Sequence, residues 1–204
     1  MATAAQFAKK FQSIGACPEG RDWILAGNHS DFRATWKVCP AGEFLAWTAT
    51  RLLGVEGTRA AVACAKAAAK LYETREPLLA PTVALCEQIV DNKVRPVEPA
   101  IKQLQTLAYD VSAAALGNTQ GTGEALLAAG YAAYAVAFAA MAVTAKEGEE
   151  KKRMIAKAAQ HSSDAVVHAW EALPGRNQGL VQLVRDSVRE EALVRAWTLA
   201  TDAK

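Results

Sequence analysis

The chain has 204 residues, 51% of them hydrophobic, and its 23 basic and 21 acidic side chains leave a net charge of +2 at pH 7. This length and apolar content predict one domain with a sizeable buried core. The near balance of charge, without a basic stripe, argues against binding to nucleic acid, so we expect no nucleic-acid partner.

Composition and patterning predict an all-α protein. Alanine is abundant, and aromatic residues make up only 7% of the chain. Ala has the highest helix propensity of all residues, and its small side chain lets helices approach closely. No run of alternating polar and apolar residues lies between turn signals, as a strand would require. We therefore expect a compact domain of about nine or ten helices over residues 1–204.

Proline, glycine and capping residues divide the first part of the chain into four predicted helices, over residues 3–14, 18–27, 30–38 and 40–54. Ser30 can cap the third helix, while Pro18 and Pro40 suit the first turns of the second and fourth. Both prolines belong to a Cys-Pro-x-Gly stretch, at residues 17–20 and 39–42. Neither stretch offers the paired cysteines of a zinc or redox site. We therefore interpret both as helix starts.

An uncharged, Ala-rich segment, residues 125–145, is the predicted central helix of the domain. Its length is close to the roughly 20 residues that span a membrane. Ala is far less lipophilic than Leu or Phe, however, and one segment of this kind is a weak insertion signal. We expect a buried helix and no membrane partner. Its bulky side chains follow helical spacing along one side: Leu127, Tyr131, Tyr134, Phe138 and Met141.

Further helices are predicted on both sides of this segment. Apolar stripes on the helix 58–74 and on the helix that follows it place Cys64 and Cys86 in the core. Residues 117–123 are rich in Gly and predicted as a mobile surface loop, and residues 173–179 form a second break before one last helix. Gln6, Lys9 and Lys10 interrupt the first apolar run of the chain, so we expect no signal peptide. We expect the four cysteines to be reduced thiols in a cytoplasmic protein.

The segment HSSDAVVHAWE carries the best candidate for metal or proton chemistry. Its polar residues lie at helical offsets that share one face: His161, Asp164, His168 and Glu171. Such a face could bind a divalent metal or transfer protons. A more apolar stripe with Val166 and Trp170 lies nearly opposite, so we expect the histidine face to be solvated. Helical bundles build metal sites from facing helices, and we therefore predict no metal or other cofactor.

A pattern in the first 50 residues is similar to that of a known family. Two cysteines and three tryptophans, the signature residues, occur in a set order: Cys17, Trp23, Trp36, Cys39 and Trp47. A Gly-acidic-aromatic step at 42–44, the stretch RAAVACAKAAAKLYETREP and the Ala-rich helix complete the pattern. Over residues 14–145 the chain resembles the immunity-protein domain of bacterial polymorphic-toxin systems, a family whose immunity role is inferred for the class. Phe44 stands where the family has Trp, and residues 146–204 are expected to form a helical extension packed on this part.

The resemblance implies an all-helical protein that binds a partner and has no catalytic residues to carry over. We therefore expect a non-enzymatic binding protein, immunity-like or an adaptor, that binds a cognate toxin or another component of a bacterial conflict system in a fixed stoichiometry. The alternative is a helical metalloprotein or small enzyme that uses the face of His161, Asp164 and His168. Tryptophans at helical positions are expected mainly as core anchors. Partner contact is expected on loops and helix ends, at residues 26–34, 117–123 and 173–179.

Overall fold

The computed structural model describes residues 3–92, 95–173, 175 and 177–202. Within these residues the chain forms eleven α-helices, one short 3-10 helix and no strand, which confirms the all-α prediction and slightly exceeds the expected number of helices. The elements in chain order are α1 (Ala4–Ser13), α2 (Pro18–Ala26), α3 (Phe32–Val38), α4 (Gly42–Leu53), η1 (Glu56–Thr58), α5 (Arg59–Ala69), α6 (Leu79–Val90), α7 (Glu98–Ala115), α8 (Gln120–Thr144), α9 (Glu149–Ala172), α10 (Asn177–Ser187) and α11 (Glu190–Asp202).

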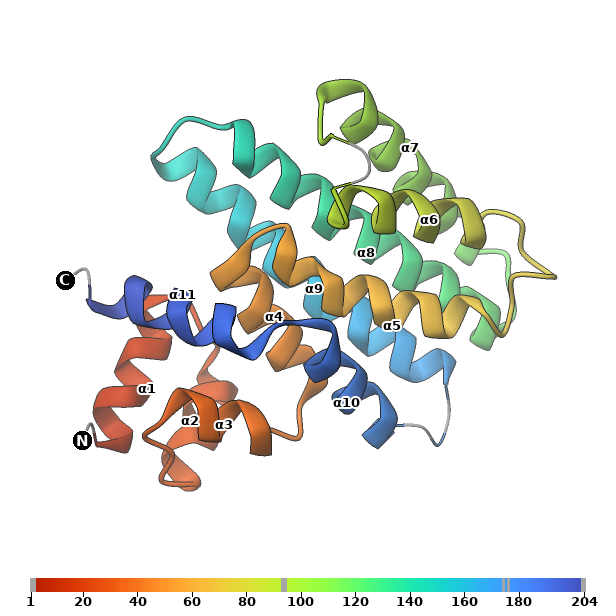
Figure 1. The fold of residues 1–204 in the computed structure, drawn as a ribbon. Helices are drawn as coiled ribbons and strands as arrows, with labels where there is room; N and C mark the ends of the chain where they lie inside the picture. The colour runs from red at the N-terminus through yellow and green to blue at the C-terminus, as the bar shows by residue number, and fades with distance from the viewer. Residues whose placement is uncertain (1–2, 93–94, 174, 176, 203–204) are drawn as a thin grey trace.

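Helices α8 and α9 form an antiparallel pair at the centre of the molecule (Figure 1). Helices α5, α6 and α7 pack against α8, while α4 and α5 pack against α9. By length and composition α8 could also cross a membrane, but 67% of its most apolar window is buried inside the fold. The prediction of a buried central helix is confirmed for this segment, and its packing partners account for its apolar character.

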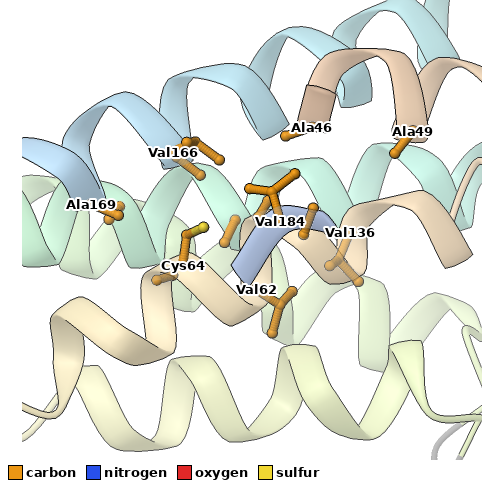
Figure 2. Close-up of a cluster of buried hydrophobic side chains, with 14 of the residues drawn as sticks. Ala46, Ala49, Val62, Cys64, Val136, Val166, Ala169 and Val184 are labelled. Carbon is orange, nitrogen blue, oxygen red and sulfur yellow. The ribbon is translucent and has the colours of Figure 1, made fainter. Parts of the chain in front are cut away.

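Alanine forms much of the core. Ala132, Ala135 and Ala139 of α8 are at most 1% exposed, whereas the five bulky residues predicted along one side of this helix are only partly buried. Figure 2 shows valines and a cysteine from four helices, α5, α8, α9 and α10, gathered in the same interior: Val62, Cys64, Val136, Val166 and Val184. Both Cys64 and Cys86 are buried, as predicted.

The buried cluster continues into the two ends of the chain. It extends from Phe7 in α1 to Trp197 in α11, and the centroids of these two rings lie 5.4 Å apart. The Phe11 ring packs on both of them, at 5.2 Å from Phe7 and 4.5 Å from Trp197. Residues of the predicted extension, 146–204, therefore contribute to the same core as the earlier helices, and α9 lies in its middle.

Only one of the two Cys-Pro-x-Gly stretches begins a helix in the predicted way. Pro18 occupies the first turn of α2, and the Cys17 sulfur caps that helix by accepting a backbone N–H at 3.4 Å. Cys39, in contrast, ends α3, and α4 begins only after Ala41. The prediction for Pro40 is wrong, because this proline stops the preceding helix rather than starting the next one.

Three other predicted boundaries also need correction. Asp31 rather than Ser30 caps α3, since its carboxylate accepts a backbone N–H at 2.8 Å. Helix α8 already begins at Gln120, so the second half of the predicted loop 117–123 is helical. The last predicted helix is two, α10 and α11, which meet at residues 188–189. Of the predicted break 173–179, residues 174 and 176 lie outside the described residues.

Candidate functional site

Four of the five signature residues line one pocket of about 430 Å³ between α2, α4 and α9. These four come from three places in the chain: Cys17, Trp23, Cys39 and Trp47. Ligand pockets commonly enclose about 300–1,000 Å³, so this one is large enough for a side chain or a small molecule. The order of these residues in the sequence thus corresponds to one concave surface, which we call the signature pocket.

The aromatic wall of the signature pocket is held by ring contacts. Phe44 and Trp47, one turn apart on α4, lie nearly parallel with their ring centroids 6.1 Å apart. Trp23 of α2 packs on His29 at 4.4 Å. A Cβ atom at Gly20 would lie 2.6 Å from the Phe44 ring. The absence of a side chain at Gly20 therefore lets α2 lie against this ring.

Trp36 takes a different role from the other signature residues. Its side chain is 4% exposed and belongs to the core. Arg185 of α10 donates hydrogen bonds to the carbonyl oxygens of Trp36 at 3.2 Å and Cys39 at 2.7 Å. These bonds satisfy carbonyl groups that the end of α3 leaves without a helical partner. The interpretation of the tryptophans as core anchors is right for Trp36 and incomplete for the two that line the pocket.

The polar side of the signature pocket carries two carboxylates and two thiols. Glu19 and Glu43 both line it, and hydrogen bonds from a backbone N–H and then from the Cys17 thiol lower the pKa of Glu19. Burial raises the pKa of the Cys39 thiol to about 11, so it stays protonated at neutral pH. Cys17 is exposed, and all four cysteines are free. A protonated thiol is a poor nucleophile, so the pocket is better suited to binding than to reaction at Cys39.

The prediction that the histidine face is solvated is only partly right, because Glu171 is 52% exposed while the two histidines are mostly covered. The side chains of His161 and His168 are only 25% and 23% exposed, because both rings pack on the bulky side of α8. His168 lies parallel to Tyr131 at a centroid distance of 5.1 Å, and His161 lies 5.5 Å from Phe138. An imidazole has a flat ring that can cover an aromatic side chain, a property that a polar-versus-apolar pattern does not represent. In the predicted apolar stripe of α9, Val166 is buried among smaller residues as expected, whereas Trp170 is 44% exposed.

The four predicted ligand residues divide into two groups. In the first group, His161 Nδ1 lies 3.7 Å from an Asp164 carboxylate oxygen. His168 Nδ1 lies 3.5 Å from a Glu171 oxygen and 2.6 Å from an oxygen of Glu124, which comes from the facing helix α8. A hydrogen bond with Glu124, followed by burial, raises the pKa of Glu171. The structure therefore supplies a partner from a second helix, which the sequence interpretation did not include.

The sequence does contain a signal for Glu124. A connection of only a few residues joins α8 to α9, and helices joined by so short a connection run antiparallel. A residue near the start of α8 must then lie opposite the end of α9, where His168 and Glu171 are found. The segment around Glu124 was predicted as the edge of a loop, which concealed this pairing.

A second large pocket holds two ion pairs between charged side chains of its lining. It has a volume of about 460 Å³ and lies between α5, α6 and α10. Across it Arg59 contacts Asp91 and Lys66 contacts Glu87, each at 2.6 Å. Since these side chains satisfy one another on a solvated surface, the groove offers less free binding capacity than the signature pocket.

The resemblance to immunity proteins stays a prediction from the sequence. Comparison of the chain with protein-family models, with curated proteins and with solved structures finds no match.

Proposed function

We propose that this chain is a non-enzymatic binding protein, of the immunity or adaptor type in a bacterial toxin or conflict system, that holds a protein partner by stoichiometric contact. The observation that supports this function is the signature pocket, because residues of α2, α4 and α9 converge on it and its three large rings remain partly exposed although they pack against the core. Half-buried aromatic side chains in a pocket are typical anchors of protein interfaces. The predicted contact segment 26–34 borders the pocket through His29, which packs on Trp23.

The chemistry of the pocket favours a basic side chain as the anchor of the partner. Trp23, Phe44 and Trp47 offer aromatic faces, and Glu19 and Glu43 supply negative charge. None of the described residues that line the pocket is Lys or Arg. Aromatic faces attract a guanidinium or ammonium group, and carboxylates form strong charge-assisted hydrogen bonds with it. An Arg or Lys of the partner would therefore meet both kinds of contact at once.

The overall charge predicts how salt affects the complex. With a net charge of +2 the chain does not attract a strongly basic partner over long distances. Affinity must come from the anchor and the contacts around it. We expect the affinity of the complex to depend only modestly on ionic strength. Substitutions in the pocket should act mainly by raising the dissociation rate.

The test is to co-express the chain with the product of the neighbouring gene and to isolate the complex. We expect rescue from toxicity and a one-to-one complex that survives moderate salt. Trp47→Ala and Glu43→Gln should each weaken binding by about tenfold or more, as loss of an interface anchor does. Trp170→Ala is the matched control, because this tryptophan is exposed on α9 and does not line the pocket.

Two results would count against the proposal. If no neighbouring product binds and the chain shows turnover that His168→Gln abolishes, the protein is an enzyme rather than a binding protein. If a complex forms but the two pocket variants bind as tightly as Trp170→Ala, the partner docks elsewhere and the signature pocket is not the contact surface.

A further inference from the structure

We propose that Glu124, His168 and Glu171 form a binding site for one divalent transition-metal ion between α8 and α9. This site is separate from the signature pocket, since none of its three residues lines that pocket. One potential ligand atom from each residue lies within 4.8 Å of the others. The ligands come from two facing helices, the arrangement from which helical bundles build metal sites.

The ligand atoms are held in place before any ion binds. His168 Nδ1 lies 2.6 Å from a Glu124 oxygen, and the imidazole is stacked within 6° of parallel on the ring of Tyr131. The exposed fractions of the Glu124 and His168 side chains are 20% and 23%. Glu171 is 52% exposed, so the site is open to solvent on one side. An ion can therefore enter without any movement of the two helices.

Charge also favours a cation at this position. Two carboxylates meet here beside one imidazole, and their mutual repulsion is relieved by a positive charge between them. Glu171 lies in the last turn of α9, where the helix dipole is negative and a carboxylate is unfavourable. A divalent ion would neutralise both carboxylates and the helix end at the same time.

The donor set identifies the class of metal. One imidazole nitrogen and two carboxylate oxygens suit Zn²⁺ and its neighbours in the first transition series. Ca²⁺ needs six to eight oxygen ligands, and Mg²⁺ keeps an octahedral set of oxygens, so both are less well matched. Three protein ligands leave at least one position for water, as in zinc sites that remain open.

The second histidine provides a matched control within the same helix. His161 also packs on the aromatic side of α8, at 5.5 Å from Phe138. Its neighbour Asp164 lies 3.7 Å away, and the pair is not part of the cluster of three ligands. His161→Gln and Asp164→Asn therefore change the same kinds of residue without removing any of the three proposed ligands.

The experiment is a titration of the full chain, freed of metal by a chelator, with Zn²⁺ in a calorimeter. Co²⁺ is used in parallel, because its visible absorption reports nitrogen and oxygen coordination. We expect one ion per chain. Glu124→Gln, His168→Gln and Glu171→Gln should each weaken binding by about tenfold or more, since even the loss of a group that only orients a ligand costs about 10–100-fold. His161→Gln and Asp164→Asn should bind as the unchanged chain does.

Three results would overturn the site. The first is no Zn²⁺ binding by the unchanged chain at a several-fold excess of the ion. The others are ligand variants that bind Zn²⁺ as tightly as the unchanged chain does, or a His161→Gln control that loses as much affinity as the ligand variants. Glu171→Gln separates loss of a ligand from misfolding, because the Glu171 side chain is half exposed. The helical signal of this variant in circular dichroism should equal that of the unchanged chain. Binding of Zn²⁺ in the absence of any protein partner also separates this site from the proposed function of the signature pocket.

Discussion

The two sides of α8 are made of different residues and have different surroundings. On one face Ala132, Ala135 and Ala139 are buried, and on the adjoining face Tyr131 and Phe138 are partly exposed beside the histidines of α9. In a typical amphipathic helix the large apolar residues face the core. Here Ala lets neighbouring helices come close, and the large rings are left at the margin of the core. The histidines of α9 pack on these rings, so the candidate metal ligands gather on that side.

The largest expected effect comes from filling the Ala side. Ala135→Leu adds a branched side chain at a position with no solvent exposure, since Ala135 is 0% exposed. Overpacking of a close-packed core costs about 1–3 kcal/mol. We expect a lower free energy of unfolding in urea and a lower melting temperature, with no change in helix content at low temperature.

The control for this variant is Ala156→Leu on α9, a position that is exposed. It makes the same chemical change without entering the core, so its unfolding midpoint should match that of the unchanged chain. Equal midpoints for both variants would mean that the Ala side of α8 is not closely packed, and the contrast between the two sides would be lost.

A smaller effect is expected on the aromatic side. Tyr131→Leu keeps apolar volume but removes the flat ring that lies 5.1 Å from His168 and 5.7 Å from His161. Aromatic ring pairs contribute about 0.5–1.5 kcal/mol beyond burial, so the loss of stability should be at or below this range. Because the His168 ring would lose its support, Zn²⁺ affinity should also fall. Tyr109→Leu on α7, where the side chain is 67% exposed, should change neither quantity.

Much of the helical fold was predictable from local signals. Pro18 at a first helical turn and the apolar spacing of Val83, Cys86 and Val90 act within one or two turns, so the chain itself carries the information. The break between α10 and α11 was missed, because the apolar residues Val184 and Val188 keep helical spacing across it and both remain buried. Spacing alone shows which residues are buried, but not whether the helix is continuous between them.

The candidate sites depend on contacts between distant segments, and these were only partly predictable. The signature residues were found in order, but their convergence depends on how α2 and α4 meet α9. The histidine face was predicted as well, but its packing against α8 was not. The His168 ring stacks on Tyr131 despite its polar character. Glu124 was missed because the site spans two helices and its own segment was predicted as a loop edge.

The smallest effect concerns the cysteines, whose reactivity should follow their burial in the close-packed core and in the signature pocket. Cys64 lies in the core of small residues (Figure 2), where burial raises its pKa to about 12. Burial also raises the pKa of Cys39 to about 11 from an ordinary 9.0. Since only the thiolate reacts, both should resist a thiol reagent in the folded chain at neutral pH, while the exposed Cys17 is labelled. Denaturant should make all four cysteines reactive.

The raised pKa values also set the direction of a pH effect on this result. A thiol whose pKa is higher in the folded chain favours folding fully below the unfolded value of 9.0, and this contribution is lost as the pH rises towards about 11 for Cys39. Native labelling of Cys39 should therefore stay slow until the pH approaches that region, and a reductant should not change the melting temperature. Mass spectrometry of peptides from the labelled native chain measures this site by site. A native Cys17–Cys39 disulfide, or labelling of Cys64 as fast as that of Cys17, would contradict both the reduced state of the pocket and the tight packing beside α8.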